Sequence, residues 1–213
     1  FEQCPKQFYH MKIAKDYHEG ETEAMRYGTE AHLVAEEFIR DGKPVPSKFA
    51  YMKDPLTALS NRRGNKLTEI RMGLTSDLEP CEFMAKNVWW RGIADFVAIT
   101  SKNALLVDYK TGKSIRYADT KQLEILSLAI FKHFPQVNTV KGGLMFLVAE
   151  ELIEARYYKE KEETYWQSWD EDIERLNECF TANVWNPQSN FSCYKFCPVH
   201  DCEHNGRRKW YAT

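Results

Sequence analysis

One nine-residue segment constrains the fold more than any other part of the chain. It reads Leu-Leu-Val-Asp-Tyr-Lys-Thr-Gly-Lys over residues 105–113, and its first half is the apolar run of a buried strand. Side chains two residues apart on a strand point to the same face, so Asp108 and Lys110 are predicted to lie together at the strand's end. A charge buried there is unfavourable unless a partner or a metal ion neutralises it. The segment therefore predicts either a chemical site or a structural ion pair at the end of a core strand.

The hydrophobic pattern of the remaining sequence predicts an α/β fold. Residues 88–100 and 104–109 are rich in β-branched and aromatic residues, and the Thr-Ser-Lys-Asn turn near their junction predicts a hairpin. Further strands are expected at 66–74, 82–86, 140–150 and 152–158, and helices at 2–15, from about 22 or 29 to 40, at 54–62, at 119–134 and at 162–182. This order predicts a mixed sheet with helices on its faces.

Composition sets wider bounds on the class of protein. The 213 residues are 43% hydrophobic and 28% charged, which fits one globular domain over residues 1–213 with a core of its own. No run approaches the roughly 18 apolar residues of a membrane span, and the first residues lack the apolar stretch of a signal peptide. A net charge of −2 does not indicate a general polyanion binder, although acidic metal ligands and basic phosphate contacts would cancel in this sum. We expect a cytoplasmic location.

Further potential ligands accompany the Asp-x-Lys strand. Asp95 lies in the preceding strand and can lie beside Asp108 if the hairpin pairs as predicted, whereas Glu69 lies in an earlier strand. His32 lies on a predicted helix, and Gln122 opens the helix that follows the Asp-x-Lys strand. Carboxylates suit Mg²⁺ or Mn²⁺, a histidine nitrogen favours tolerance of Mn²⁺, and a lysine can orient or deprotonate a water molecule. Taken singly, each of these residues also fits an ordinary surface or half-buried position.

Together these residues resemble the motifs of the PD-(D/E)XK nuclease superfamily, in particular its RecB-like exonuclease branch. The matching positions are Gly28-x-x-x-His32, Glu69, Gly92-x-x-Asp95, Asp108-Tyr109-Lys110 and Gln122. The resemblance implies a restriction-endonuclease-like fold, with a mixed central β-sheet flanked by helices. It implies catalytic roles for Asp95, Asp108, Lys110, Glu69 and Gln122, and Mg²⁺ or Mn²⁺ ligation by His32, Glu69, Asp95, Asp108 and the backbone carbonyl of Tyr109. Two positions depart from the family: Leu126 stands where a tyrosine often follows the glutamine, and Ala94 rather than a proline precedes Asp95.

The activity that this resemblance implies is metal-dependent exonucleolytic hydrolysis of DNA, in recombination, repair or processing. Linear DNA with free ends would be the substrate, and a recombination or replication protein a partner. The chain has the size of the short single-domain versions carried by tailed phages, which would act in the host cytoplasm. A structure-specific endonuclease of the same superfamily and a non-catalytic DNA-end-binding or scaffold protein are the alternatives. The oligomeric state stays open.

Three of the six cysteines lie within ten residues, at Cys193, Cys197 and Cys202. Thiolates at this spacing repel one another unless a cation or a cluster holds them, which favours a soft metal. The resemblance implies a [4Fe–4S] cluster with Cys4 as the fourth ligand, so that the cysteine-rich tail of about residues 183–213 closes on the N-terminus.

Zinc is the alternative to iron and sulfur at these cysteines, with Cys4, His200 or His204 completing a tetrahedral site. Free thiols are a third interpretation. Cys81 and Cys179 have no place in any of these schemes.

Basic residues near the expected site and in the tail are candidate contacts to DNA phosphates. They are Lys113, Arg116, Arg62, Arg63, Arg207 and Arg208. Each group also fits an ordinary solvated run of charges.

Overall fold

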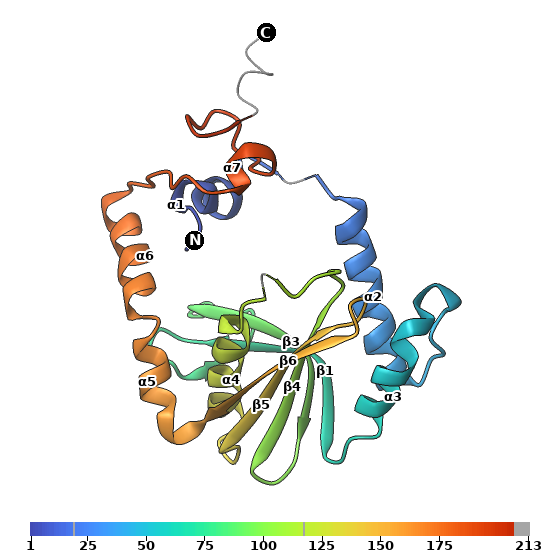
Figure 1. Cartoon of the computed structure of the whole chain (residues 1–213). Helices are drawn as coiled ribbons and strands as arrows, with labels where there is room; N and C mark the ends of the chain where they lie inside the picture. The colour runs from blue at the N-terminus through green and yellow to red at the C-terminus, as the bar shows by residue number, and fades with distance from the viewer. Residues whose placement is uncertain (19, 117, 207–213) are drawn as a thin grey trace. The chain divides into compact units, whose positions relative to one another are not determined.

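The chain forms an α/β structure around one mixed β-sheet (Figure 1). The computed structural model describes residues 1–18, 20–116 and 118–206. The chain divides into two compact units. The sheet unit is Thr22–Tyr165, and the terminal unit combines Phe1–Glu21 with the segment from Trp166 onward. The expected single domain over the whole chain stays a prediction.

The sheet has six strands in the order β2-β1-β3-β4-β5-β6. The strands are β1 (Asn65–Leu74), β2 (Pro80–Cys81), β3 (Trp90–Ile99), β4 (Asn103–Lys110), β5 (Thr139–Phe146) and β6 (Glu151–Tyr158). Strands β4 and β5 pair in parallel, and the other neighbours are antiparallel. A parallel pair needs a crossover connection, which helix α4 (Lys121–His133) supplies. The mixed, helix-flanked sheet that the sequence predicts is confirmed.

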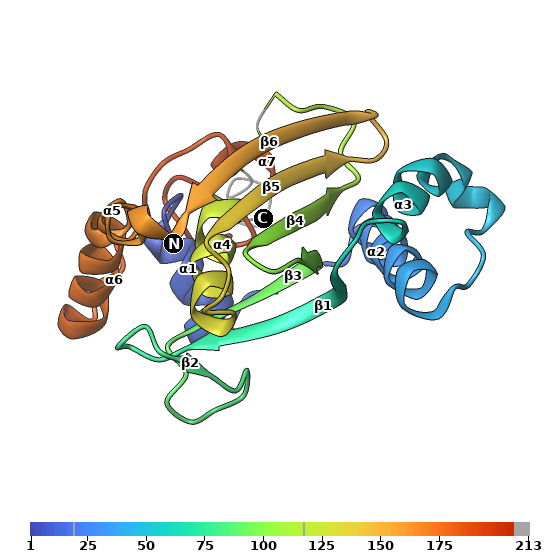
Figure 2. The ribbon, with the colours of Figure 1, turned by 90° about the horizontal axis from the view of Figure 1, so that it is seen from below.

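Helices cover both faces of this sheet (Figure 2). On one face lie α2 (Glu23–Asp41), a 3₁₀ turn (Ser47–Met52) and α3 (Lys53–Ser60), whose buried side chains share a core with β3 and β4. On the other face lies α4, where Leu126 approaches Gly92 and Leu123 approaches Gly142. A Cβ added to Gly142 would lie 3.2 Å from Leu123, so the small residue lets the helix pack closely against the sheet.

Local signals at its two ends define α2, the helix that carries His32. The Thr22 hydroxyl caps the first turn by accepting a hydrogen bond of 3.2 Å from the amide of Met25. At the other end Gly42 takes the left-handed conformation, with φ of 68°, which glycine adopts without steric strain. The helix therefore has a defined length and holds His32 at a fixed height above the sheet.

The terminal unit is assembled from the two ends of the chain. Its helices are α1 (Pro5–Phe8), a π-helical turn (Tyr9–Ala14), α6 (Asp170–Ala182) and α7 (Ser192–Lys195), and α5 (Glu162–Gln167) spans the boundary. The Asn190 side-chain amide donates to the Gln3 carbonyl at 2.9 Å. The ring of Trp185 lies 5.3 Å from that of Tyr9. These contacts hold the N-terminal segment against the segment that follows α6.

Four predicted elements differ from the structure. The strand expected at 140–150 ends at Phe146, where a turn over residues 147–150 begins. The strand expected at 82–86 is wrong: β2 is Pro80–Cys81, and Ala85 turns back onto Glu82 through a backbone hydrogen bond of 2.9 Å. The helix expected at 162–182 is interrupted between Gln167 and Asp170, and the helix expected at 2–15 changes from α to π geometry. In the described part of the chain, no helix combines the length and apolar character needed to cross a bilayer.

Candidate active site

Three acidic residues occupy one row across three neighbouring strands. The β1–β3 register pairs Thr68 with Phe96 and Ile70 with Ala94, which sets Glu69 opposite Asp95. The β3–β4 pairing ends at Phe96 opposite Val107. Asp95 and Asp108 come directly after this pair, one on each strand, and therefore lie opposite each other. Residues opposite one another in a sheet have neighbouring side chains. The row therefore gathers three carboxylates that are far apart in the sequence.

Glu69 has an unusual backbone conformation for a strand residue. Its φ of +49° lies in the left-handed region, which non-glycine residues in strands rarely adopt. Such a conformation is unfavourable by about 1–3 kcal/mol and is found mainly at functional sites. It redirects the Glu69 side chain at the point where the carboxylates meet.

Asp95 organises the centre of the row. It is buried, and its Oδ2 accepts a hydrogen bond of 2.7 Å from the Tyr109 amide. Its Oδ1 lies 3.3 Å from His32 Nδ1, while His32 Nε2 lies 3.1 Å from the Tyr109 carbonyl oxygen. Both ring nitrogens of His32 thus face oxygen atoms, an arrangement that suits the protonated ring.

Asp108, Lys110 and Gln122 form a second group of contacts. Lys110 Nζ lies 2.7 Å from Asp108 Oδ2 and donates a hydrogen bond of 2.8 Å to Gln122 Oε1. The Gln122 amide nitrogen donates to Asp108 Oδ1. The Asp108 side chain is 4% exposed and that of Lys110 34%. The lysine ammonium is therefore fixed between a buried carboxylate and an amide, with one side open to solvent.

The crowded charges shift the acid–base behaviour of the site. Burial raises the pKa of Asp108 and the Asp95 carboxylate raises it further, and together these two effects outweigh the lowering of the pKa by Lys110 and His32. Burial and Asp95 likewise raise the pKa of Glu69. The hydrogen bond to Asp95 raises the pKa of His32 against the opposing effect of burial. Such perturbed groups gather at sites that bind a cation or perform acid–base chemistry.

Within the described residues, one group of three side chains has the spacing of a metal-binding site. Ligand atoms of His32, Glu69 and Asp95 all lie within 4.8 Å of one another. One nitrogen and several carboxylate oxygens form a donor set suited to Mg²⁺ or Mn²⁺. The buried Asp108 carboxylate and the Tyr109 carbonyl oxygen adjoin this group. The residues thus fit the divalent metal that the sequence predicts.

A hollow of about 440 Å³ opens beside these residues. His32 and Glu69 line it, together with Gly28 and Glu36. A Cβ on Gly28 would lie 3.4 Å from the Thr111 hydroxyl, so glycine keeps this side open. Sequence reasoning missed Glu36, although its spacing of one helical turn from His32 could have indicated it.

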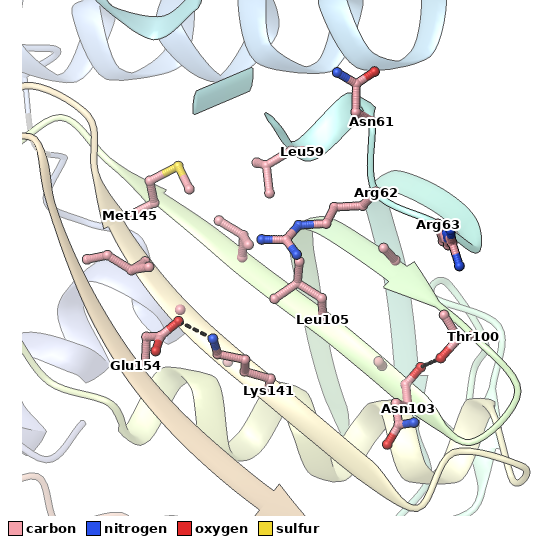
Figure 3. Close-up of a pocket in the computed structure, with 16 residues that line it drawn as sticks. Leu59, Asn61, Arg62, Arg63, Thr100, Asn103, Leu105, Lys141, Met145 and Glu154 are labelled. Carbon is pink, nitrogen blue, oxygen red and sulfur yellow. Dashed lines mark hydrogen bonds and ion pairs between the residues drawn. The ribbon is translucent and has the colours of Figure 1, made fainter. Parts of the chain in front are cut away.

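The other predicted basic residues are not all near this site. Lys113 and Arg116 are exposed on the connection between Lys110 and α4, close to the site in sequence. Arg62 and Arg63 line a different hollow beside Asn103 (Figure 3). Asn103 begins β4, five residues or about 17 Å along the strand from Asp108. Arg207 and Arg208 lie outside the described residues.

The four predicted cluster cysteines all belong to the terminal unit and are all buried. Burial raises the pKa of Cys197, and the nearby Cys193, Cys202 and Cys4 raise it further. Among the described residues, however, no three cysteine sulfurs lie within 4.8 Å of one another. Sequence reasoning also missed Asn205, whose buried amide donates to the carbonyls of Cys197 and Val199 at 3.0 and 2.9 Å.

Leu126 occupies the position where the resembling family often has a tyrosine. Its side chain is buried, and its Cδ2 would lie 3.0 Å from a Cβ on Gly92. It therefore packs in the core against β3.

The chain belongs to the PD-(D/E)XK nuclease superfamily, whose sequence profile matches residues 1–202. A crystal structure from Eubacterium rectale, provisionally described as an exonuclease, is similar with a TM-score of 0.51 and 11% identity, over 94% of this chain and 79% of that one. The structure of SSO0001 gives a TM-score of 0.46 and 13% identity over 95% and 82% of the two chains. A comparison with curated proteins gave no match. The fold and the family thus define a nuclease, a hydrolase for which DNA is the substrate and divalent metals the cofactors.

The raised pKa of Asp108 leads to a stability prediction. An acid whose pKa is higher in the folded than in the unfolded protein is favoured by folding when protonated, so stability is lost as pH rises through the folded pKa. Asp108→Asn removes this charge. In EDTA at neutral pH we expect the variant to melt at a higher temperature than the parent, because the neutral amide avoids the cost of burying the carboxylate charge. Differential scanning calorimetry from pH 4 to 8 would measure it, and an equal or lower melting temperature would contradict the prediction.

Proposed function

We propose that this protein is a Mg²⁺- or Mn²⁺-dependent exonuclease that shortens linear DNA from its ends. The observation that carries the proposal is the row of Glu69, Asp95 and Asp108, joined by His32 on one side and Lys110 on the other. The provisional description of the similar Eubacterium rectale protein supports exonucleolytic cleavage. Recombination, repair or DNA processing in the cytoplasm is the proposed setting.

The proposed metal ligands are His32, Glu69, Asp95, Asp108 and the Tyr109 carbonyl oxygen. A divalent metal at this site would acidify a bound water molecule and neutralise charge on the scissile phosphate. His32 can ligate only through an unprotonated nitrogen, and its pKa is raised by Asp95. Metal binding therefore competes with protons at His32 and is expected to weaken as the pH falls.

Lys110 is proposed to position the attacking water and to stabilise negative charge on the phosphate. Its ammonium is fixed by Asp108 and Gln122, 2.7 Å and 2.8 Å away. This double contact limits the motion of a flexible side chain before substrate binds. Gln122 is thus a positioning residue that acts through Lys110 and Asp108. The exposed Lys113 and Arg116 on the adjoining connection are proposed phosphate contacts.

For the terminal unit we propose a [4Fe–4S] cluster held by Cys4, Cys193, Cys197 and Cys202. Four buried thiols in one unit are a suitable donor set. Ligands of one zinc ion lie about 2.3 Å from it, so three sulfurs on one ion would lie within about 4.6 Å of one another. No three of the described cysteine sulfurs lie within 4.8 Å of one another, so the proposal rests on the burial of the four thiols and on their shared unit.

End-labelled linear DNA, single- and double-stranded, and a closed circle of the same sequence test the proposed function. Each is incubated with Mg²⁺, Mn²⁺ or EDTA. We expect metal-dependent release of short products from linear DNA and an intact circle. Cleavage of the circle would indicate an endonuclease instead. DNA binding without cleavage, by protein with a cooperative melting transition, would favour a scaffold on a nuclease fold.

A further inference from the structure

A second surface of the sheet unit has the features of a binding site and is separate from the carboxylate row. It lies on the sheet face that α3 leaves uncovered, where β4, β5 and β6 run side by side (Figure 3). Two hollows of about 550 and 340 Å³ adjoin there. Met145 and Leu152 line both hollows and are paired across β5 and β6. The Met145–Leu152 pair thus marks the junction of one continuous binding face.

The floor of this face is apolar and accessible. Leu152 is 50% exposed, although it stands at the middle of the face. Gly143 lies under it, and a Cβ there would come within 3.0 Å of Leu152 Cδ1. Leu105 of β4 and the buried Leu59 of α3 also line the larger hollow. Polar and charged residues frame these apolar side chains.

The two ends of the face carry opposite charges. At the larger hollow lie Arg62 and Arg63, and the Arg62 guanidinium reaches over the floor beside Leu105 (Figure 3). At the smaller hollow lie Asp54, Glu150 and Glu151. None of these five side chains has an ion pair or side-chain hydrogen bond with the described residues, whereas Lys141 between the ends is paired with Glu154.

This charge pattern selects among possible occupants. A nucleic acid strand that followed the face would bring phosphates against three unpaired carboxylates, which is unfavourable. An extended peptide can insert side chains into both hollows, and about six residues cover roughly 20 Å.

We propose that this face binds an extended segment of a partner protein in which acidic residues, apolar residues and basic residues follow one another. The acidic end lies against Arg62 and Arg63. The apolar centre covers Leu152, and the basic end lies against Asp54, Glu150 and Glu151. The proposal is independent of nuclease activity, because none of the carboxylate-row residues lines either hollow.

The test uses a fluorescein-labelled Asp-Asp-Leu-Leu-Lys-Lys peptide and fluorescence anisotropy with the full chain. We expect saturable binding with a Kd below about 1 mM. Arg62→Glu should weaken binding about tenfold, which corresponds to about 1.4 kcal/mol. The matched control Lys102→Glu changes an exposed lysine that lines neither hollow and should leave the Kd unchanged. Circular dichroism and melting temperature verify that each variant is folded.

A charge exchange makes the test specific. A Lys-Lys-Leu-Leu-Lys-Lys peptide should bind Arg62→Glu more tightly than it binds the parent protein. The proposal would be overturned if the parent protein bound both peptides with equal affinity, or if it showed no saturable binding of the Asp-Asp-Leu-Leu-Lys-Lys peptide. It would also be overturned if Arg62→Glu left peptide binding unchanged but abolished either DNA binding or a dimer detected by sedimentation velocity, because the occupant would then be DNA or a second copy.

Discussion

Lys110→Ala is expected to lower the rate constant of DNA cleavage by about 10²–10⁴-fold, the range typical of a group that transfers or positions a proton. The Lys110 ammonium is the cation paired with the buried Asp108 carboxylate, and it bridges that carboxylate to Gln122. No other lysine is placed in the carboxylate row of the described chain. No neighbouring lysine in this row can therefore supply the ammonium group that Lys110→Ala removes.

Single-turnover cleavage of end-labelled DNA measures this effect without interference from product release. Lys102→Ala is the matched control, because it removes an exposed lysine before the opposite end of β4. The control should keep the parent rate, and Lys110→Ala should retain its melting transition. A Lys110→Ala rate within about threefold of the parent would fall well short of the expected loss and reject the assigned role.

Cys197→Ser is expected to remove the proposed iron–sulfur cluster and to destabilise the terminal unit. The parent protein, purified without oxygen, should contain about four irons per chain, and the variant almost none. A cross-link between Cys4 and the C-terminal cysteines closes a loop of most of the chain, which in a chain-entropy view contributes about 5 kcal/mol. The variant should lose a contribution of this size.

Metal analysis, the visible absorption spectrum and urea unfolding would measure these changes. Cys179→Ser is the matched control, since Cys179 lies on α6 of the same unit and is only half-buried. It should keep the iron and the stability of the parent. Zinc in place of iron in the parent, or full iron content in Cys197→Ser, would contradict the proposed cluster.

The central part of the site could be predicted because strand geometry is simple. A period of two residues places Asp108 and Lys110 together, and a short hairpin turn brings Asp95 to the same level. The contacts of Lys110 with Asp108, and of Asp95 with the Tyr109 amide, agree with this reasoning.

Other features depend on tertiary structure that the sequence pattern does not reveal. The alignment of Glu69 with Asp95 requires the β1–β3 register, and the left-handed backbone of Glu69 has no signal in its residue type. Residues 82–86 place three apolar residues between Glu82 and Lys86, but no strand pairs with them in the described sheet. The distance of Arg62 from the carboxylates follows from the length of β4. Local patterns contain none of this information.

The terminal unit contains both ends of the chain, and this has a consequence for its folding during synthesis on the ribosome. Thr22–Tyr165 is complete once its last strand has emerged, whereas the proposed cluster partners of Cys4 begin at Cys193. At about 5–20 residues per second, roughly 10–40 s separate translation of these two positions. During this interval the N-terminal segment is exposed to chaperones and oxidants without its final contacts. Insertion of the cluster would thus be a late event, and a truncated chain would retain its carboxylate row while leaving Cys4 unprotected.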